Sequence, residues 1–123
     1  MLNWNQIEQA EPEELSVALK THFSTKLPTQ IETAEEMREA QKLLSKLASQ
    51  YSFLTSISVE VKNRKRKMKR EKAEKELIDA MMEREDLLNA YCESVKMSYN
   101  AISRMITIRQ QIYEELRMTS SMP

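Results

Sequence analysis

A run of positive charge in the middle of the chain has the clearest chemical meaning. Residues 62–75 contain nine lysines and arginines and only two acids. Such side chains bind phosphates, and a protein that neutralises several phosphates releases counterions, so its binding depends steeply on salt. The residues that we predict to contact nucleic acid here are Lys62, Arg64, Lys65, Arg66, Lys67, Lys69 and Arg70.

The composition of this basic segment also predicts a mode of binding. It holds no aromatic residue, and Asn63 is its only amide. Stacking on bases needs aromatic rings, and amides are common readers of base edges. We therefore expect contacts to backbone phosphates without sequence preference. Two alternatives stay open: pairing with acidic helices of this chain or its neighbours, and a solvated helix that serves solubility alone.

Catalytic and metal-binding patterns are missing from the sequence. His22 is the only histidine and Cys92 the only cysteine, so a thiolate zinc site is excluded. No nucleophile motif accompanies His22, and no Glu-x-x-His pair of the kind that builds a di-metal helical bundle is present. We expect a non-catalytic protein with no metal, no cofactor and no small-molecule substrate.

The composition restricts the fold to helices. The 123 residues include no glycine, which sheet proteins need in tight turns and which phosphate-binding loops require. No run approaches 18 apolar residues, so we expect no membrane span and no membrane partner. The single cysteine and the lack of a signal peptide predict a cytoplasmic location, either bacterial or in a host cell.

Two prolines divide the chain. Pro12 opens an apolar pattern that predicts a short N-terminal helix, and Pro28 predicts a break after it. We expect an acidic N-terminal segment with this short helix over residues 1–28. Residues 29–123 are expected to form a long helical hairpin or rod with a basic middle segment.

Apolar residues spaced alternately three and four positions apart predict two long helices of coiled-coil character. The first follows Thr33 and Glu36, which have the spacing of a capping box, and the second is expected at about residues 74–118. The residues that we predict to form a seam for an oligomer or a partner are Leu44, Leu47, Tyr51, Leu54, Leu88, Val95, Tyr99, Ile102 and Ile106.

The two seams are out of phase by one residue across the basic segment, where lysines replace the apolar stripe. The chain therefore either continues as one rod or turns, near residues 56–63 or near residues 70–75. We favour an antiparallel helical hairpin with a basic tip. The predicted fold is all-α, with a short N-terminal helix before two long helices.

The apolar stripes are too broad for two helices to cover. Leu43 and Phe53 widen the first stripe, and several residues widen the second. Long exposed apolar strips are typical of partner surfaces, so we expect a homo-oligomer. In the alternative, the N-terminal helix folds back over one side and makes a three-helix monomer.

The closing helix offers a resemblance to a known family. It carries Ala101-Ile102-Ser103-Arg104, then Ile106, Ile108 and Arg109, after an aromatic-and-cysteine stretch at Tyr91-Cys92. In these residues the chain resembles the UvsY-type recombination mediator proteins of tailed phages, which are small and helical, bind single-stranded DNA and assemble into rings. The resemblance implies single-stranded DNA as the partner, with Arg104 and Arg109 as DNA or assembly residues.

These observations give two hypotheses for function. The first is a non-catalytic helical oligomer that binds nucleic acid through backbone phosphates, as an accessory protein in phage recombination or replication. The second is a protein-binding adaptor, scaffold or inhibitor that docks helices of a larger complex. Loss of DNA binding when basic residues of 62–75 are replaced separates the two.

Overall fold

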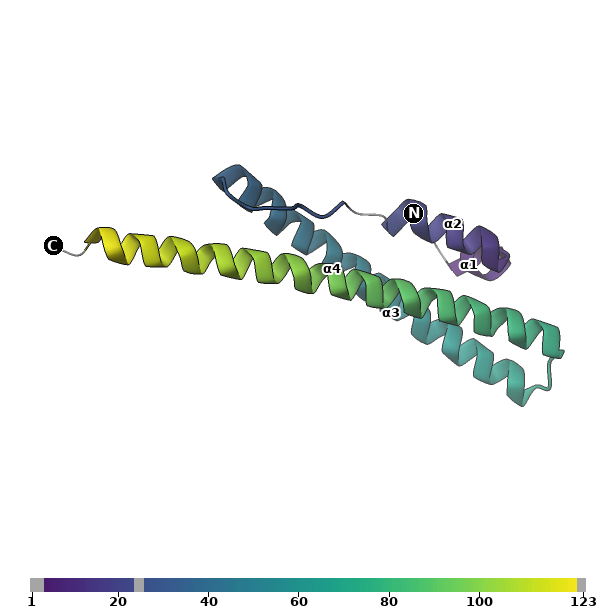
Figure 1. Cartoon of the computed structure of the whole chain (residues 1–123). Helices are drawn as coiled ribbons and strands as arrows, with labels where there is room; N and C mark the ends of the chain where they lie inside the picture. Colours follow the sequence, from purple (N-terminus) through teal and green to yellow (C-terminus); the bar gives the residue numbers. More distant parts are fainter. Residues whose placement is uncertain (1–3, 24–25, 122–123) are drawn as a thin grey trace.

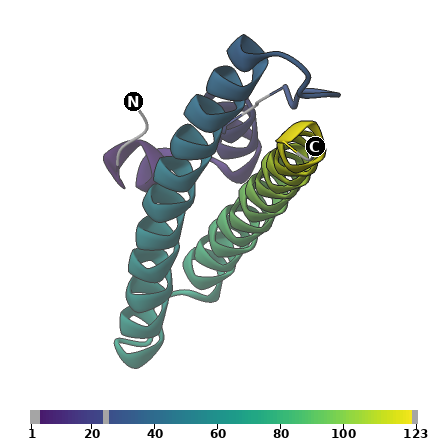
Figure 2. The ribbon, with the colours of Figure 1, turned by 90° about the vertical axis from the view of Figure 1, so that its left-hand side faces the viewer.

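The computed structural model describes residues 4–23 and 26–121, and its regular elements there are all helices. Two long helices form an antiparallel hairpin, and two short ones lie over the half nearer its turn (Figure 1). Viewed from the open end, the turn lies at the far end of the long pair (Figure 2). The predicted all-α hairpin is confirmed. The elements in chain order are α1 (Trp4–Gln9), α2 (Pro12–Phe23), α3 (Ala34–Arg70) and α4 (Lys75–Ser121).

Local signals set where α2 and α3 begin. Pro12 is the first residue of α2, because its fixed φ suits the first helical position and its missing N–H needs no partner there. Thr33 caps α3: its side chain accepts from the N–H of Glu36 at 3.0 Å, and Glu36 accepts from the N–H of Thr33 at 3.1 Å. The predicted capping box is therefore confirmed.

The six-residue helix α1 is an addition to the predicted fold. It is shorter than two turns and carries no charge signal at either end. A distant residue satisfies the backbone beyond it, because Arg84 of α4 donates from Nε and Nη2 to the carbonyl of Ala10, at 3.2 and 2.9 Å. A bond between positions so far apart in the chain leaves no trace in the local sequence pattern.

The hairpin turns at residues 71–74, which lies within the second of the two predicted places. Ala73 N–H donates to the carbonyl of Met68 at 2.9 Å, and Lys72 N–H donates to that of Lys69 at 3.3 Å. This pair of bonds is the Schellman ending of a helix, and Lys72 takes its left-handed position with φ 56°. The helix ends here because its next turn would bring lysines, and no apolar residues, to the seam.

The core is a seam between α3 and α4 that the short helices extend on one side. Leu15 and Leu19 of α2 join it, and the rings of Phe23 and Phe53 stack with centroids 6.2 Å apart. The N-terminal helix thus folds back over one side of the hairpin, as the monomer alternative required, while the other side stays open. The buried apolar residues of α3 and α4 are Ala40, Leu47, Leu54, Ile57, Val61, Met81, Leu88, Val95, Ile102 and Ile106.

No helix of the described part combines the length and the hydropathy that crossing a bilayer requires.

Replacing Leu88 by Ala tests the seam. Leu88 is fully buried, so the change removes apolar contacts and leaves a cavity, which lowers the free energy of unfolding by about 2–4 kcal/mol. The matched control is Leu77→Ala on the same helix, where the side chain is 53% exposed and the expected change is below about 0.5 kcal/mol. Urea unfolding followed by circular dichroism measures both. Equal losses in the two variants would contradict the seam.

Replacing Lys72 by Gly tests the turn. A residue with a Cβ in the left-handed region is strained, whereas glycine occupies this region freely. We expect Lys72→Gly to raise the free energy of unfolding by about 0.5–1 kcal/mol, and Lys67→Gly, inside α3, to lower it by about 1 kcal/mol. A loss of stability in Lys72→Gly would show that the turn lies elsewhere.

Candidate nucleic-acid interface

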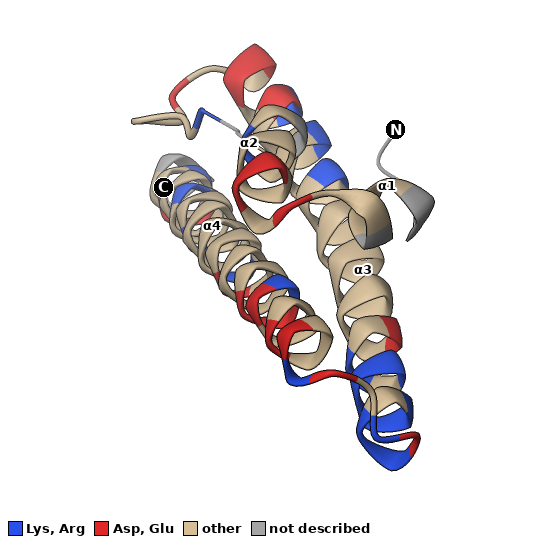
Figure 3. Ribbon diagram, turned by 90° about the vertical axis from the view of Figure 1, so that its right-hand side faces the viewer, with Lys and Arg blue, Asp and Glu red and all other residues tan. Residues whose placement is uncertain are grey.

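The basic segment occupies the C-terminal end of α3 and the turn, and acidic residues follow on the first turns of α4 (Figure 3). Successive residues of a helix are about 100° apart around its axis, so the basic side chains surround α3. Their surroundings differ from one side of the helix to another. The differences decide which of them are available to a ligand.

One side of α3 carries cations without nearby acids. Lys62, Arg66 and Lys69 are spaced four and three residues apart, so they lie on one side of the helix, and all three are exposed. Arg70 lies next to them and is also exposed. Within residues 4–23 and 26–121, no carboxylate oxygen lies within 4.0 Å of these four cations. We call Lys62, Arg66 and Lys69 the cationic face.

The opposite flank of the helix neutralises its own cations. Arg64 lies 3.4 Å from the carboxylate of Glu60, and Lys67 lies 4.0 Å from that of Glu71, each pair being four residues apart. Exposed pairs of this kind add little stability, but they place a negative charge beside each cation. Arg64 and Lys67 therefore carry less uncompensated positive charge than the cationic face.

Lys65 is taken up inside the hairpin. Its Nζ forms a salt bridge with Glu85 of α4, and the two side chains are only 17% and 13% exposed. A partly buried pair like this one holds the two helices in register, and removing one partner leaves the other charge partly buried and unpaired. Of the seven predicted basic contacts, Arg64, Lys65 and Lys67 thus have partners of their own, which leaves four cations for a polyanion.

An acidic ridge lies on the outer side of α4. Glu76, Asp79, Glu83 and Asp86 are spaced three or four residues apart and are all exposed. The buried residues of α4 lie on the other side of the helix, so the ridge faces away from α3. The acidic ridge and the cationic face therefore lie on separate surfaces.

The two arginines implied by the family resemblance lie near the other end of the hairpin. Arg104 is exposed on α4. Arg109 donates to the backbone carbonyl of Glu32 at 3.3 Å, and its guanidinium lies 4.8 Å from the centre of the Tyr113 ring. Arg109 therefore ties α4 to the segment before α3, and neither arginine joins the cationic face.

The predicted partner seam is mostly occupied within the chain. Leu47, Leu54, Leu88, Val95, Ile102 and Ile106 are buried, and Leu44 and Tyr99 are half-buried against them. Tyr51 is the most exposed of the nine, at 37%. These residues hold the hairpin together, and the apolar side chains left to solvent at the end of α4 are Ile108, Ile112, Tyr113, Leu116 and Met118.

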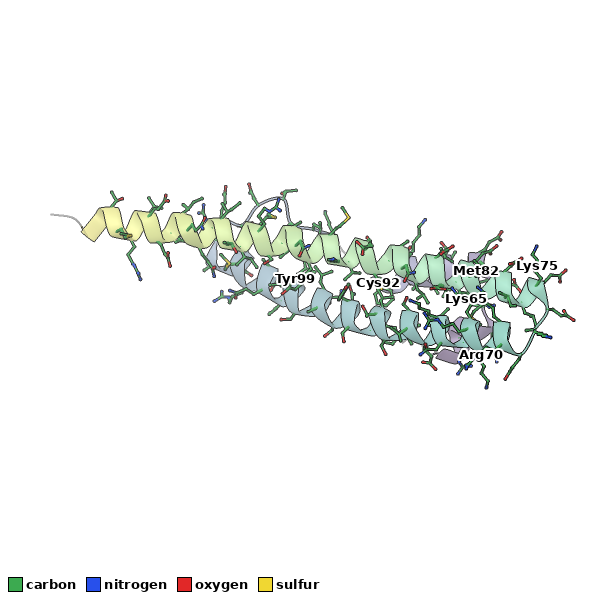
Figure 4. All side chains as sticks on the ribbon, turned by 90° about the horizontal axis from the view of Figure 1, so that it is seen from below. Lys65, Arg70, Lys75, Met82, Cys92 and Tyr99 are labelled. Atoms are coloured by element: carbon green, nitrogen blue, oxygen red, sulfur yellow. The ribbon has the colours of Figure 1, made fainter. Side chains whose placement is uncertain are left out.

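The open side of the hairpin carries features that sequence reasoning missed. Figure 4 views this side and shows Lys65, Cys92 and Tyr99 between the two long helices. Ser58 Oγ of α3 donates to Asn89 Oδ1 of α4 at 2.5 Å, so polar groups join the helices on this surface. Spacing alone predicts that the tyrosines belong to a seam, and only the register of the hairpin shows what they face.

Cys92 lies half-buried on the same side. Burial raises the pKa of the Cys92 thiol above its usual value, and a hydrogen bond from Thr55 opposes this shift. The neighbouring charge of Glu93 raises the pKa further. The thiol is therefore protonated at neutral pH and is a poor nucleophile.

In the described residues, no three or more His, Cys, Asp or Glu side chains are grouped so that they could hold a metal ion.

No protein-family model, no curated protein and no solved structure matches this chain. The geometry of the chain is thus the basis for a functional assignment.

The state of Cys92 gives a prediction about reactivity. We expect iodoacetamide to alkylate Cys92 about tenfold more slowly in the folded protein at pH 8 than in urea, because the fold keeps the thiol protonated and half-covered. The rate in the folded protein rises with pH as the thiolate forms. The same raised pKa lowers the free energy of unfolding at alkaline pH, because the thiol ionises at a lower pH in the unfolded chain than in the folded protein. Mass spectrometry follows the reaction, and equal rates in both states would contradict the burial.

Proposed function

We propose that this protein is a non-catalytic nucleic-acid-binding protein whose cationic face contacts backbone phosphates. The observation that carries the proposal is the set of exposed cations Lys62, Arg66, Lys69 and Arg70, none with an acid within 4.0 Å in the described part of the chain. Like charges four residues apart on a helix repel one another, and phosphates relieve that repulsion. A polyanion is therefore the natural ligand of this surface.

The predicted mode is binding without sequence preference. Contacts from lysine and arginine to phosphate position a protein on a strand and carry no sequence information. With about three or four phosphates neutralised by one chain, the affinity of a single copy is modest and falls steeply with salt. The preferred partner in this proposal is single-stranded DNA. The protein would serve phage recombination or replication in the cytoplasm of a bacterial or host cell.

Assembly of several copies would strengthen such weak sites. Linked sites gain avidity because the second contact is made at a high effective concentration. The apolar side chains exposed near the end of α4, including Ile112 and Leu116, support self-association there. A homo-oligomer would present the cationic face repeatedly along one strand.

The same apolar end favours a second candidate function. α4 is ten residues longer than α3, and Leu116 and Met118, on its last turns, are 60% and 62% exposed. A protein that docks helices of a larger complex would use such a surface, with flexible methionine adapting to its partner. In this case the cationic face serves solubility or an acidic partner.

The test replaces Lys62, Arg66 and Lys69 together by Gln. We expect the affinity for a fluorescent oligothymidine at 50 mM salt to fall by about tenfold or more. The slope of log affinity against log salt falls by about 2, since each lost contact to a single strand removes about 0.7. Fluorescence anisotropy over a salt series measures both quantities.

The matched control makes the same charge change elsewhere on α3. Arg38, Lys42 and Lys46 are exposed near its N-terminal end, and their replacement by Gln leaves the cationic face intact. We expect this triple variant to bind within about twofold of the parent protein. Equal losses in both triples, or no binding by the parent at 50 mM salt, would remove the proposal in favour of the adaptor.

A further inference from the structure

A small apolar groove crosses the open side of the hairpin, away from α1 and α2. It has a volume of about 230 Å³, far more than the roughly 30 Å³ that a water molecule occupies. Ala48 and Tyr51 of α3 line one wall, and Lys96 and Tyr99 of α4 line the other. Tyr51 is 37% exposed, and Tyr99 is half-buried against the core, so each residue keeps some surface in contact with solvent. We call these four residues the tyrosine groove.

The tyrosine groove and the cationic face belong to one surface. Six residues spaced three or four positions apart form one line along α3. In chain order they are Tyr51, Thr55, Ser58, Lys62, Arg66 and Lys69. On α4, Asn89 and Lys96 are seven residues apart and form a matching line. The hydrogen bond between Ser58 and Asn89 joins the two lines midway. Figure 4 shows this side, with Tyr99 at one end of the labelled residues and Arg70 near the turn.

The dimensions of this surface suit a chain of nucleotides. Lys62 lies eleven positions after Tyr51, which corresponds to about 16 Å along the helix. A strand that reaches from the groove to the cationic face would pass over the small polar side chains of Thr55 and Ser58, which leave room for it. Lys96 supplies a cation at the groove itself, and Glu93 is the acid beside it on α4.

The combination of tyrosines and cations distinguishes among polyanions. Tyrosine rings in an apolar groove stack on nucleobases, and they do so without sequence preference because every base has a π face. In a duplex the bases are stacked on one another and cannot enter the groove. An acidic peptide would satisfy the cations but offers no regular supply of planar rings.

We infer that the tyrosine groove seats an unpaired base of a single-stranded nucleic acid whose phosphates lie on the cationic face. This inference rests on the proposed function and adds to it the reason for a single-strand preference. The cationic face supplies most of the affinity for any nucleic acid. The groove supplies the discrimination against duplexes.

The experiment replaces Tyr51 and Tyr99 together by Leu, which keeps apolar bulk and removes the rings. We expect the affinity for oligothymidine to fall by about tenfold or more, while the affinity for a duplex of the same length changes by less than about twofold. The salt slope stays that of the parent, because no phosphate contact is lost. The paired replacement by Phe retains the rings and binds within about twofold of the parent. Circular dichroism confirms that each variant keeps its helices.

A matched control and a direct mapping complete the test. Met97→Leu changes an apolar side chain of α4 that is 69% exposed and does not line the groove, and it leaves single-strand binding unchanged. In the parent protein, we expect an oligonucleotide that carries 5-iododeoxyuridine to form photo-crosslinks with Tyr51 or Tyr99.

The outcomes separate this inference from the proposal on which it rests. If the Leu variant binds single strands as the parent does, or if its affinities for single strands and duplex fall equally, the inference that the tyrosine groove binds a base is wrong. The proposal that the cationic face binds phosphates then still stands. If neither nucleic acid binds at low salt, both proposals fall together. Crosslinks confined to residues outside the tyrosine groove would also overturn the inference that a base binds there.

Discussion

The apolar seam between α3 and α4 is the constraint on which the rest of the molecule depends. Once Leu54, Val61 and Leu88 are buried, the rotation of each long helix about its own axis is fixed. Every other side chain on those helices is then assigned to a side. The seam therefore selects which cations meet carboxylates, which tyrosines line a groove and which flank α2 covers.

Electrostatics then refine what packing has set. The basic segment is one block in sequence but three environments in space: a cationic face, a flank paired with glutamates of its own helix, and Lys65 held by Glu85 across the hairpin. Burying charge is costly unless it is paired, which explains why the inward-leaning cation is the one with a partner on the other helix. The net charge of zero thus hides a strongly uneven surface.

Much of the fold could be predicted from local patterns. Pro12, the capping box at Thr33 and the alternating three-four spacing each report an event within a few residues, and each has its predicted outcome in the structure. The turn could only be narrowed to two places, because lysine is a poor choice for the left-handed position that Lys72 adopts. Features that join distant residues, such as Arg84 with Ala10 and the walls of the tyrosine groove, depend on the register of the hairpin and have no local signature.

The separation of the cationic face from the acidic ridge of α4 has a consequence for how the molecule approaches other bodies. Opposite charges on two sides of a narrow rod give it a dipole moment across its width. In the field of a polyanion such a rod rotates before it arrives, so productive orientations are favoured during encounter. The same dipole would let one chain adsorb to matrices of either charge, although its formal charge at neutral pH is nil.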